Sequence, residues 1–167
     1  MGASKIGTTT SDRRSAGGVG ARRSAVPALA TYAGLAAVVA LAAVALVGGA
    51  GSFGADKAVD ALKALSAIAL AFLGGIRWGM AMRVETTPRG ALTIAASVIP
   101  ALVAAVAMLL PDAAALGLLA AGFAGIGAWD VWTAEAGGAP SWYGRLRLRA
   151  TLIATAALVA VLLSLGI

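Results

Sequence analysis

Residues 73–82, LGGIRWGMAM, place a single arginine, Arg77, inside a long run of apolar residues. Three glycines and a tryptophan, Trp78, lie close to it in the same stretch. An ionisable side chain at membrane depth is rare, and it pairs with another polar group or marks a functional site. The stretch therefore predicts a membrane-spanning helix whose arginine needs a partner within the protein.

The composition of the whole chain points to a membrane protein. Of its 167 residues, 60% are hydrophobic and 12% are charged, and the mean hydropathy is +0.93. A soluble domain carries roughly 25% charged residues. Since each crossing of a bilayer needs about 20 apolar residues, the apolar segments use nearly all of the chain after its first 25 residues. This leaves no length for a soluble catalytic domain.

We expect an all-α fold, an integral membrane bundle of five transmembrane helices over residues 28–47, 60–82, 91–110, 113–131 and 150–166. Pro27 suits the first turn of the first helix, and Asp56 is the expected N-cap of the second. Pro100 should kink the third helix, because proline removes a backbone hydrogen bond. The domain is expected to span residues 26–167, after a disordered basic cytoplasmic tail at residues 1–25.

The positive charges predict how this bundle is oriented. With five crossings, ten of the 13 lysines and arginines fall on the N-terminal side, whereas only Lys57 and Lys63 fall on the other and Arg77 lies within a span. Cytoplasmic loops carry the excess of positive residues, so the prediction is N-in and C-out. The leader is rich in alanine and glycine, which favours a bacterial inner membrane over an organelle transit peptide.

Aromatic and basic residues collect at the predicted inner boundary. Such an inner interface is expected to contact the lipid bilayer and its anionic headgroups. Its members are Trp78, Trp129, Trp132, Trp142, Tyr143, Arg145, Arg147 and Arg149.

Two sets of residues inside the spans are candidates for contacts between helices. Ala67, Ala71, Gly75 and Gly79 recur every four residues, a small-residue ladder that would allow a neighbouring helix to approach closely. Arg77 and Asp130 lie at similar predicted depths on the second and fourth spans, so we expect them to form an intramembrane polar pair. Arg77 could alternatively snorkel to the boundary without a partner.

The residue types that the sequence lacks exclude several kinds of reaction and of metal site. The sequence has no cysteine and no histidine, which removes disulfides, thiolate nucleophiles, most zinc sites and histidine-ligated haem. No pair among its seven acidic residues has the helical spacing of a di-metal site within a span. We expect no metal and no cofactor. Nucleic acid is not an expected partner either, because the basic residues lie beside apolar spans.

Two motifs support a family resemblance. Residues 73–81, together with Asp130 ten positions before the run PSWYGRLR at residues 140–147, resemble the uncharacterised family of small bacterial multi-pass inner-membrane proteins related to mitochondrial transmembrane protein sixty-nine. The resemblance implies a multi-pass fold and assigns no activity or catalytic residue. Many members of that family carry histidine at the position of Arg77, and arginine stays charged, so it implies no proton-shuttling role here.

Three functions remain open from the sequence. The favoured one is a non-enzymatic accessory, assembly or lipid-interacting protein, whose partner would be anionic lipid, another membrane protein complex or further copies of the chain. The alternative is a small oligomeric transporter or channel for an anionic solute that uses Arg77. A lipid-acting enzyme, in which Asp130 and Glu135 near Arg145 would bind a headgroup phosphate through a metal, is the third and weakest. No nucleophile and base pair is visible.

Overall fold

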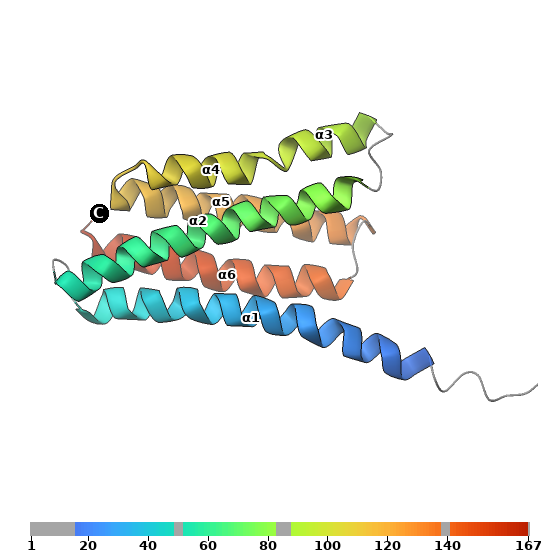
Figure 1. Cartoon of the computed structure of the whole chain (residues 1–167), viewed down its shortest axis with the longest axis horizontal. Helices are drawn as coiled ribbons and strands as arrows, with labels where there is room; N and C mark the ends of the chain where they lie inside the picture. The colour runs from blue at the N-terminus through green and yellow to red at the C-terminus, as the bar shows by residue number, and fades with distance from the viewer. Residues whose placement is uncertain (1–15, 49–51, 83–87, 138–140, 167) are drawn as a thin grey trace, which may run out of the picture.

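The computed structural model describes residues 16–48, 52–82, 88–137 and 141–166. Over these residues the chain forms six helices, which run along one common axis (Figure 1). They are α1 (Ala16–Gly48), α2 (Phe53–Ala81), α3 (Pro88–Ala96), α4 (Ile99–Met108), α5 (Asp112–Glu135) and α6 (Ser141–Ser164). The predicted all-α class is confirmed.

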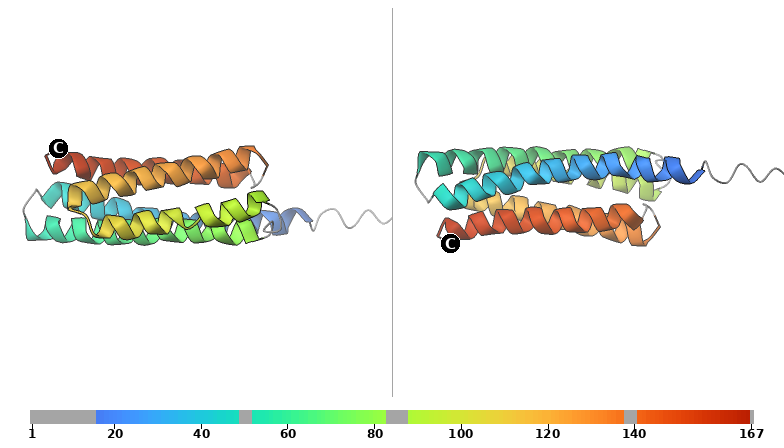
Figure 2. Two further views of the ribbon diagram at one scale, coloured as in Figure 1. Left: turned by 90° about the horizontal axis from the view of Figure 1, so that it is seen from above. Right: turned by 90° about the horizontal axis from the view of Figure 1, so that it is seen from below.

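Five segments of these helices are long and apolar enough to cross a membrane, as expected from the sequence. They are Val26–Gly48, Phe53–Ala81, Gly90–Met108, Asp112–Glu135 and Trp142–Ser164, with α3 and α4 together supplying the third. The start of α1 and the C-terminus lie at opposite ends of the bundle (Figures 1 and 2).

One end of the bundle gathers the arginines of the described helices. There α1 and α3 begin, α2 and α5 end, and α6 begins (Figure 1). We call this the arginine end, and its described side chains include Arg77, Arg145, Arg147 and Arg149. At the opposite end Lys63 of α2 forms an ion pair with Asp112 of α5, with Nζ 2.7 Å from Oδ1.

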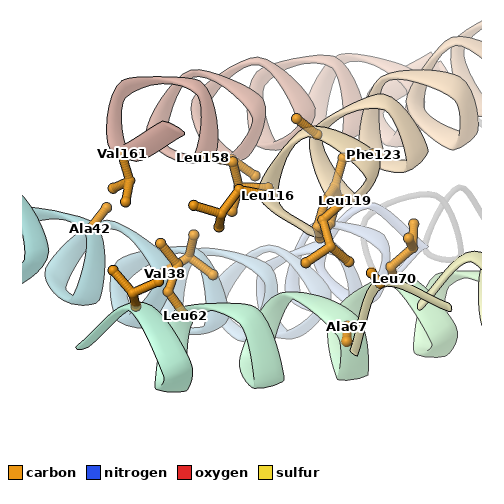
Figure 3. Packing of buried hydrophobic residues seen from close by; sticks show 14 of the residues in the cluster. Val38, Ala42, Leu62, Ala67, Leu70, Leu116, Leu119, Phe123, Leu158 and Val161 are labelled. Carbon is orange, nitrogen blue, oxygen red and sulfur yellow. The ribbon is translucent and has the colours of Figure 1, made fainter. Parts of the chain in front are cut away.

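The core lies between α1, α2, α5 and α6, with a smaller contribution from α4 (Figure 3). Leu62 and Leu70 of α2, Leu116 and Leu119 of α5 and Leu158 of α6 are fully buried in it. Lipid is as apolar as leucine, so in a bilayer these contacts stabilise the bundle through close van der Waals packing rather than through escape from water. The complementary shapes of the helices therefore matter more than their hydropathy.

The third span is interrupted by a short turn at Ser97 and Val98, beside Pro100, where the kink is expected. Helix α3 ends at Ala96 and α4 starts at Ile99, with Pro100 in the first turn of α4. Proline cannot donate the backbone hydrogen bond that a continuous helix needs, and the first turn of a new helix tolerates that loss. The carbonyl oxygen of Ser97 lies against Gly74 of α2, where an added Cβ would be only 2.6 Å from the oxygen.

Three helix ends differ from those expected. Residues 16–25 were predicted to be disordered and are helical, so Pro27 lies inside α1 rather than in its first turn; residues 1–15 are outside the described part. A helix continuing from an established span needs no new nucleation, which favours this extension. Ser52, not Asp56, caps α2, since its Oγ accepts from the Ala55 N–H at 3.2 Å. Helix α6 begins at Ser141, nine residues before the predicted span.

The small-residue ladder does not act as one packing face within the chain. Ala67 is buried in the core and Ala71 packs partly against it, but Gly75 and Gly79 are exposed, and a Cβ added to either would meet nothing within 4 Å. Each step of four residues advances about 40° around a helix with 3.6 residues per turn, so Ala67 and Gly79 point about 120° apart. Gly74, outside the ladder, makes the close approach instead.

Candidate functional site

One carboxylate, that of Asp130, lies between two guanidinium groups at the arginine end. Its Oδ1 is 3.0 Å from Nε of Arg77 on α2, and its Oδ2 accepts a 2.7 Å hydrogen bond from Nε of Arg147 on α6. All three side chains are buried, with 2% of Asp130, 3% of Arg77 and 7% of Arg147 exposed. The structure thus brings together the expected pair, Arg77 and Asp130, and adds Arg147 as a third member. We call the three residues the charge cluster.

Arg77 contacts three residues of α5. Its Nη2 donates a 2.8 Å hydrogen bond to Oγ1 of Thr133, which in turn donates to the carbonyl of Trp129 at 2.8 Å. Its Cζ lies 4.2 Å from the centre of the Trp129 ring, a cation–π contact. The Nε–H does not point along a hydrogen bond to Asp130, so that contact is electrostatic. Arg77 is therefore held by α5 from several sides.

The α6 side of the cluster also has a donor without a hydrogen bond. Tyr143 and Arg147 are four residues apart, so they share one face of α6. The Tyr143 hydroxyl lies 3.5 Å from Asp130 Oδ2, at the long limit of a hydrogen bond. Nη2 of Arg147 is buried and makes no hydrogen bond. A buried donor of a charged group without a partner is costly, so this atom is the place where an additional acceptor would be most favourable.

The charge cluster carries a net positive charge. Two guanidiniums and one carboxylate leave one positive charge uncompensated among buried side chains. Buried ion pairs are tolerated when their geometry is good, but an extra unpaired charge adds a large desolvation cost. The arrangement therefore favours a monovalent anion beside Arg147.

The other members of the predicted inner interface surround the cluster and face outward. Arg145 and Arg149 are exposed, because they stand two residues to either side of the buried Arg147 on a helix. Trp78 and Trp142 are partly exposed, and 67% of Trp132 is exposed. Trp142 also packs edge-on against Tyr143, with the ring centres 6.1 Å apart. Of the eight predicted residues, only Trp129, Tyr143 and Arg147 contact Asp130 or Arg77.

A cavity of about 380 Å³ adjoins the cluster between α1, α2 and α6. Its polar lining includes Tyr143 and Arg147 near the start of α6 and Thr31 of α1, whereas the rest of the wall is almost entirely apolar. The apolar lining comprises Pro27, Ala30, Gly34, Leu35, Val38, Leu65, Ala69, Phe72, Leu73, Ile76, Phe123, Leu146, Ala150 and Ala154. The cavity therefore has one cationic end and one hydrocarbon end.

The acids proposed for metal binding do not come together. Asp130 is committed to the two arginines, while Glu135 is exposed at the end of α5. Among the described residues, no group of three acidic side chains is placed to share a metal ion. Asp130 thus has two arginines, and not further acids, as its charged neighbours among the described residues.

The fold and the charge cluster define a class: five apolar helices indicate a multi-pass membrane protein, with a buried, positively charged cluster at one end. The chain belongs to the family described as "Protein of unknown function (DUF3429)", whose sequence model matches residues 26–163. No curated protein and no solved structure matches the chain.

Proposed function

We propose that this chain is a non-enzymatic protein of a bacterial inner membrane that interacts with anionic lipid at its arginine end and acts there as an accessory factor. In this proposal the arginine end faces the cytoplasm, with the N-terminus inside and the C-terminus outside. The chain is also proposed to be related to mitochondrial transmembrane protein sixty-nine, on the basis of the motifs at residues 73–81 and 140–147.

One observation carries the proposal: the charge cluster has one more buried cation than anion, and Nη2 of Arg147, on its α6 side, is a buried donor without a hydrogen bond. Exposed Arg145 and Arg149 and the tryptophans Trp132 and Trp142 lie around it at the same end. Basic side chains near a membrane surface attract anionic headgroups, and tryptophan favours the headgroup region. The net charge of the cluster and the exposed arginines and tryptophans therefore support an anionic lipid as the partner.

The alternative, a transporter or channel that uses Arg77, has less support. Transport of an anion through a site on Arg77 needs that guanidinium to face a polar path, yet it is buried against Asp130, Thr133 and Trp129. The cavity beside the cluster is lined mainly by apolar residues. Anion uptake into liposomes by the purified protein, abolished in Arg77→Ala, would favour this alternative.

Lipid recovery tests the proposed function. Extraction of the protein into polymer-bounded discs without detergent, followed by mass spectrometry of the lipids, should show anionic lipid enriched over the bulk membrane. One favourable arginine contact worth about 1 kcal/mol corresponds to roughly fivefold enrichment. An unrelated five-span protein extracted in the same way serves as control. A lipid composition equal to that of the bulk membrane would contradict the proposal.

Reporter fusions test the proposed orientation. Alkaline phosphatase fused after Ile167 should be active and a green fluorescent protein fused there should be dark, because ten basic residues hold the arginine end in the cytoplasm. A fluorescent protein fused before Met1 should be bright. Bright fluorescence at the C-terminus with inactive phosphatase would show the opposite orientation.

A further inference from the structure

The cavity beside the charge cluster has the shape and polarity of a site for one lipid molecule. Its volume, about 380 Å³, lies near the lower end of the range of about 300–1,000 Å³ for ligand pockets. That volume suits one hydrocarbon chain better than two. Its polar lining residues are Tyr143, Arg147 and Thr151 on α6 and Thr31 on α1. The one charged group, Arg147, lies near the start of α6, which distinguishes a headgroup end from a tail end.

The length of the cavity matches one leaflet of a bilayer. Its lining on α6 runs from Tyr143 to Ala154, a distance of roughly 16 Å at 1.5 Å of rise per residue. Half of a hydrocarbon core about 30 Å thick is about 15 Å. The cationic end lies near the arginine end of the bundle, and the apolar end lies toward its middle, between Val38, Leu65 and Phe123. A lipid of the adjacent leaflet is oriented in the same way, with its headgroup at the end of the bundle and its acyl chains toward the middle.

The cavity is open to the outside of the bundle. Ala30 and Gly34 of α1 and Phe72 of α2 belong to its wall and are exposed. A Cβ added to Gly34 would meet nothing within 4 Å, so the space beside it is free. An acyl chain can thus enter sideways from the bilayer, between α1 and α2, without the helices separating.

The cationic end of the cavity explains why the bound lipid should be anionic. Arg147 lines the cavity, is nine-tenths buried, and has its Nη2 without a hydrogen-bond partner. A single negative charge there would make the charge cluster neutral overall, with guanidiniums and anions alternating. The Tyr143 hydroxyl, also on the wall, could donate to the same anion in place of its long 3.5 Å contact with Asp130 Oδ2.

We propose that the cavity between α1, α2 and α6 binds one anionic phospholipid of the surrounding leaflet, with its phosphate on Arg147 and Tyr143 and one acyl chain along the apolar wall. This inference rests on the proposed function and makes it specific to one site. The second acyl chain and the glycerol remain outside, in the bilayer. A zwitterionic lipid brings its own cation toward the arginines, so it binds more weakly.

Native mass spectrometry from nanodiscs that hold equal amounts of phosphatidylglycerol and phosphatidylcholine tests the site. Wild-type protein should retain one phosphatidylglycerol per chain. Arg147→Gln should lower the retained fraction about tenfold, because it removes a charged hydrogen-bond donor. Arg145→Gln, an exposed arginine on the same helix, should retain the lipid within about twofold of wild type.

A second pair of variants leaves the charge cluster untouched. Gly34→Leu fills the cavity and should also lower retention about tenfold, whereas Gly75→Leu, an equally open glycine on α2 outside the cavity, should not. Circular dichroism establishes that each variant is folded. Equal retention by Arg147→Gln and Arg145→Gln, or by Gly34→Leu and Gly75→Leu, overturns the site but leaves general lipid interaction intact. Equal retention of both lipids by wild type instead overturns the proposed function itself.

Discussion

Replacement of Asp130 by asparagine should lower the free energy of unfolding in mixed micelles by about 3 kcal/mol, since breaking a buried ion pair on one side costs about 3–5 kcal/mol. The substitution keeps the shape of the side chain and leaves Arg77 and Arg147 buried without their shared carboxylate. The net charge of the cluster then rises from one to two positive charges. Asp112→Asn is the matched control, because that aspartate also lies on α5 beside a cation but is half exposed. Its effect should stay below about 1 kcal/mol.

The ranking of three variants by stability distinguishes an effect of charge from an effect of packing at the charge cluster. Arg147→Gln leaves Arg77 and Asp130 as a neutral pair, so it should cost less than Asp130→Asn. The double variant Asp130→Asn/Arg147→Gln carries the same net charge as wild type, so it should be more stable than Asp130→Asn alone. Two outcomes would show that the net charge of the cluster does not govern stability. One is that Arg147→Gln destabilises the protein as much as Asp130→Asn. The other is that the destabilisation of the double variant equals the sum of the two single effects within about 0.5 kcal/mol.

The pairing of Arg77 with Asp130 could be predicted from the sequence because few acids were available to it. A buried guanidinium needs an anion at its own depth, and Asp130 is the acid near the arginine end that falls within the predicted span at residues 113–131. Depth along a helix follows from residue number alone, at about 1.5 Å per residue. The pair could thus be inferred without knowing which helices are neighbours.

The third member of the cluster could not be predicted in the same way. Arg145, Arg147 and Arg149 alternate with leucine, and a span expected to start at residue 150 places all three in the headgroup region. Helix α6 starts at Ser141 instead, which moves Arg147 inside the bundle. The sequence did not show where α6 begins. Once α6 includes these residues, Tyr143 and Arg147 lie on one face of the helix, and Arg145 and Arg149 lie on other faces.

The glycines that contact a neighbouring helix were the hardest feature to predict. Small residues allow close contact at many positions, and the sequence does not indicate which of these positions are used. Gly75 and Gly79 have the expected spacing and no neighbour within the described chain, whereas Gly74 and Gly127 meet another helix at distances that exclude a side chain. The rotation of α2 and α5 about their own axes determines which glycines are used. That rotation depends on the burial of Leu62, Leu70 and Leu119 against neighbouring helices, which hydropathy does not report.

Replacement of Gly127 by alanine should destabilise the protein by about 2 kcal/mol, within the usual range of about 1–3 kcal/mol for an overpacked core. A Cβ at this position would lie 2.5 Å from Cγ2 and 2.8 Å from Cβ of Thr151, far inside van der Waals contact. Helices α5 and α6 share the most extensive interface in the bundle, so α6 must shift as a unit. Asp130 and Arg147 lie one turn away from this contact, and their 2.7 Å hydrogen bond should lengthen too.

Gly125→Ala is the matched control, two residues earlier on the same helix. Nothing lies within 4 Å of a Cβ there, so alanine should stabilise α5 by about 0.5–1 kcal/mol through its better helix propensity. Thr151→Ala removes Oγ1 and Cγ2, two of the three atoms in conflict, and should recover part of the loss when combined with Gly127→Ala. Thermal unfolding in nanodiscs compares the stability of wild type, Gly127→Ala, Gly125→Ala and the double variant Gly127→Ala/Thr151→Ala. Equal stability of Gly127→Ala and Gly125→Ala would mean that α5 and α6 are not in close contact at Thr151, and the α6 side of the charge cluster would then lack its support.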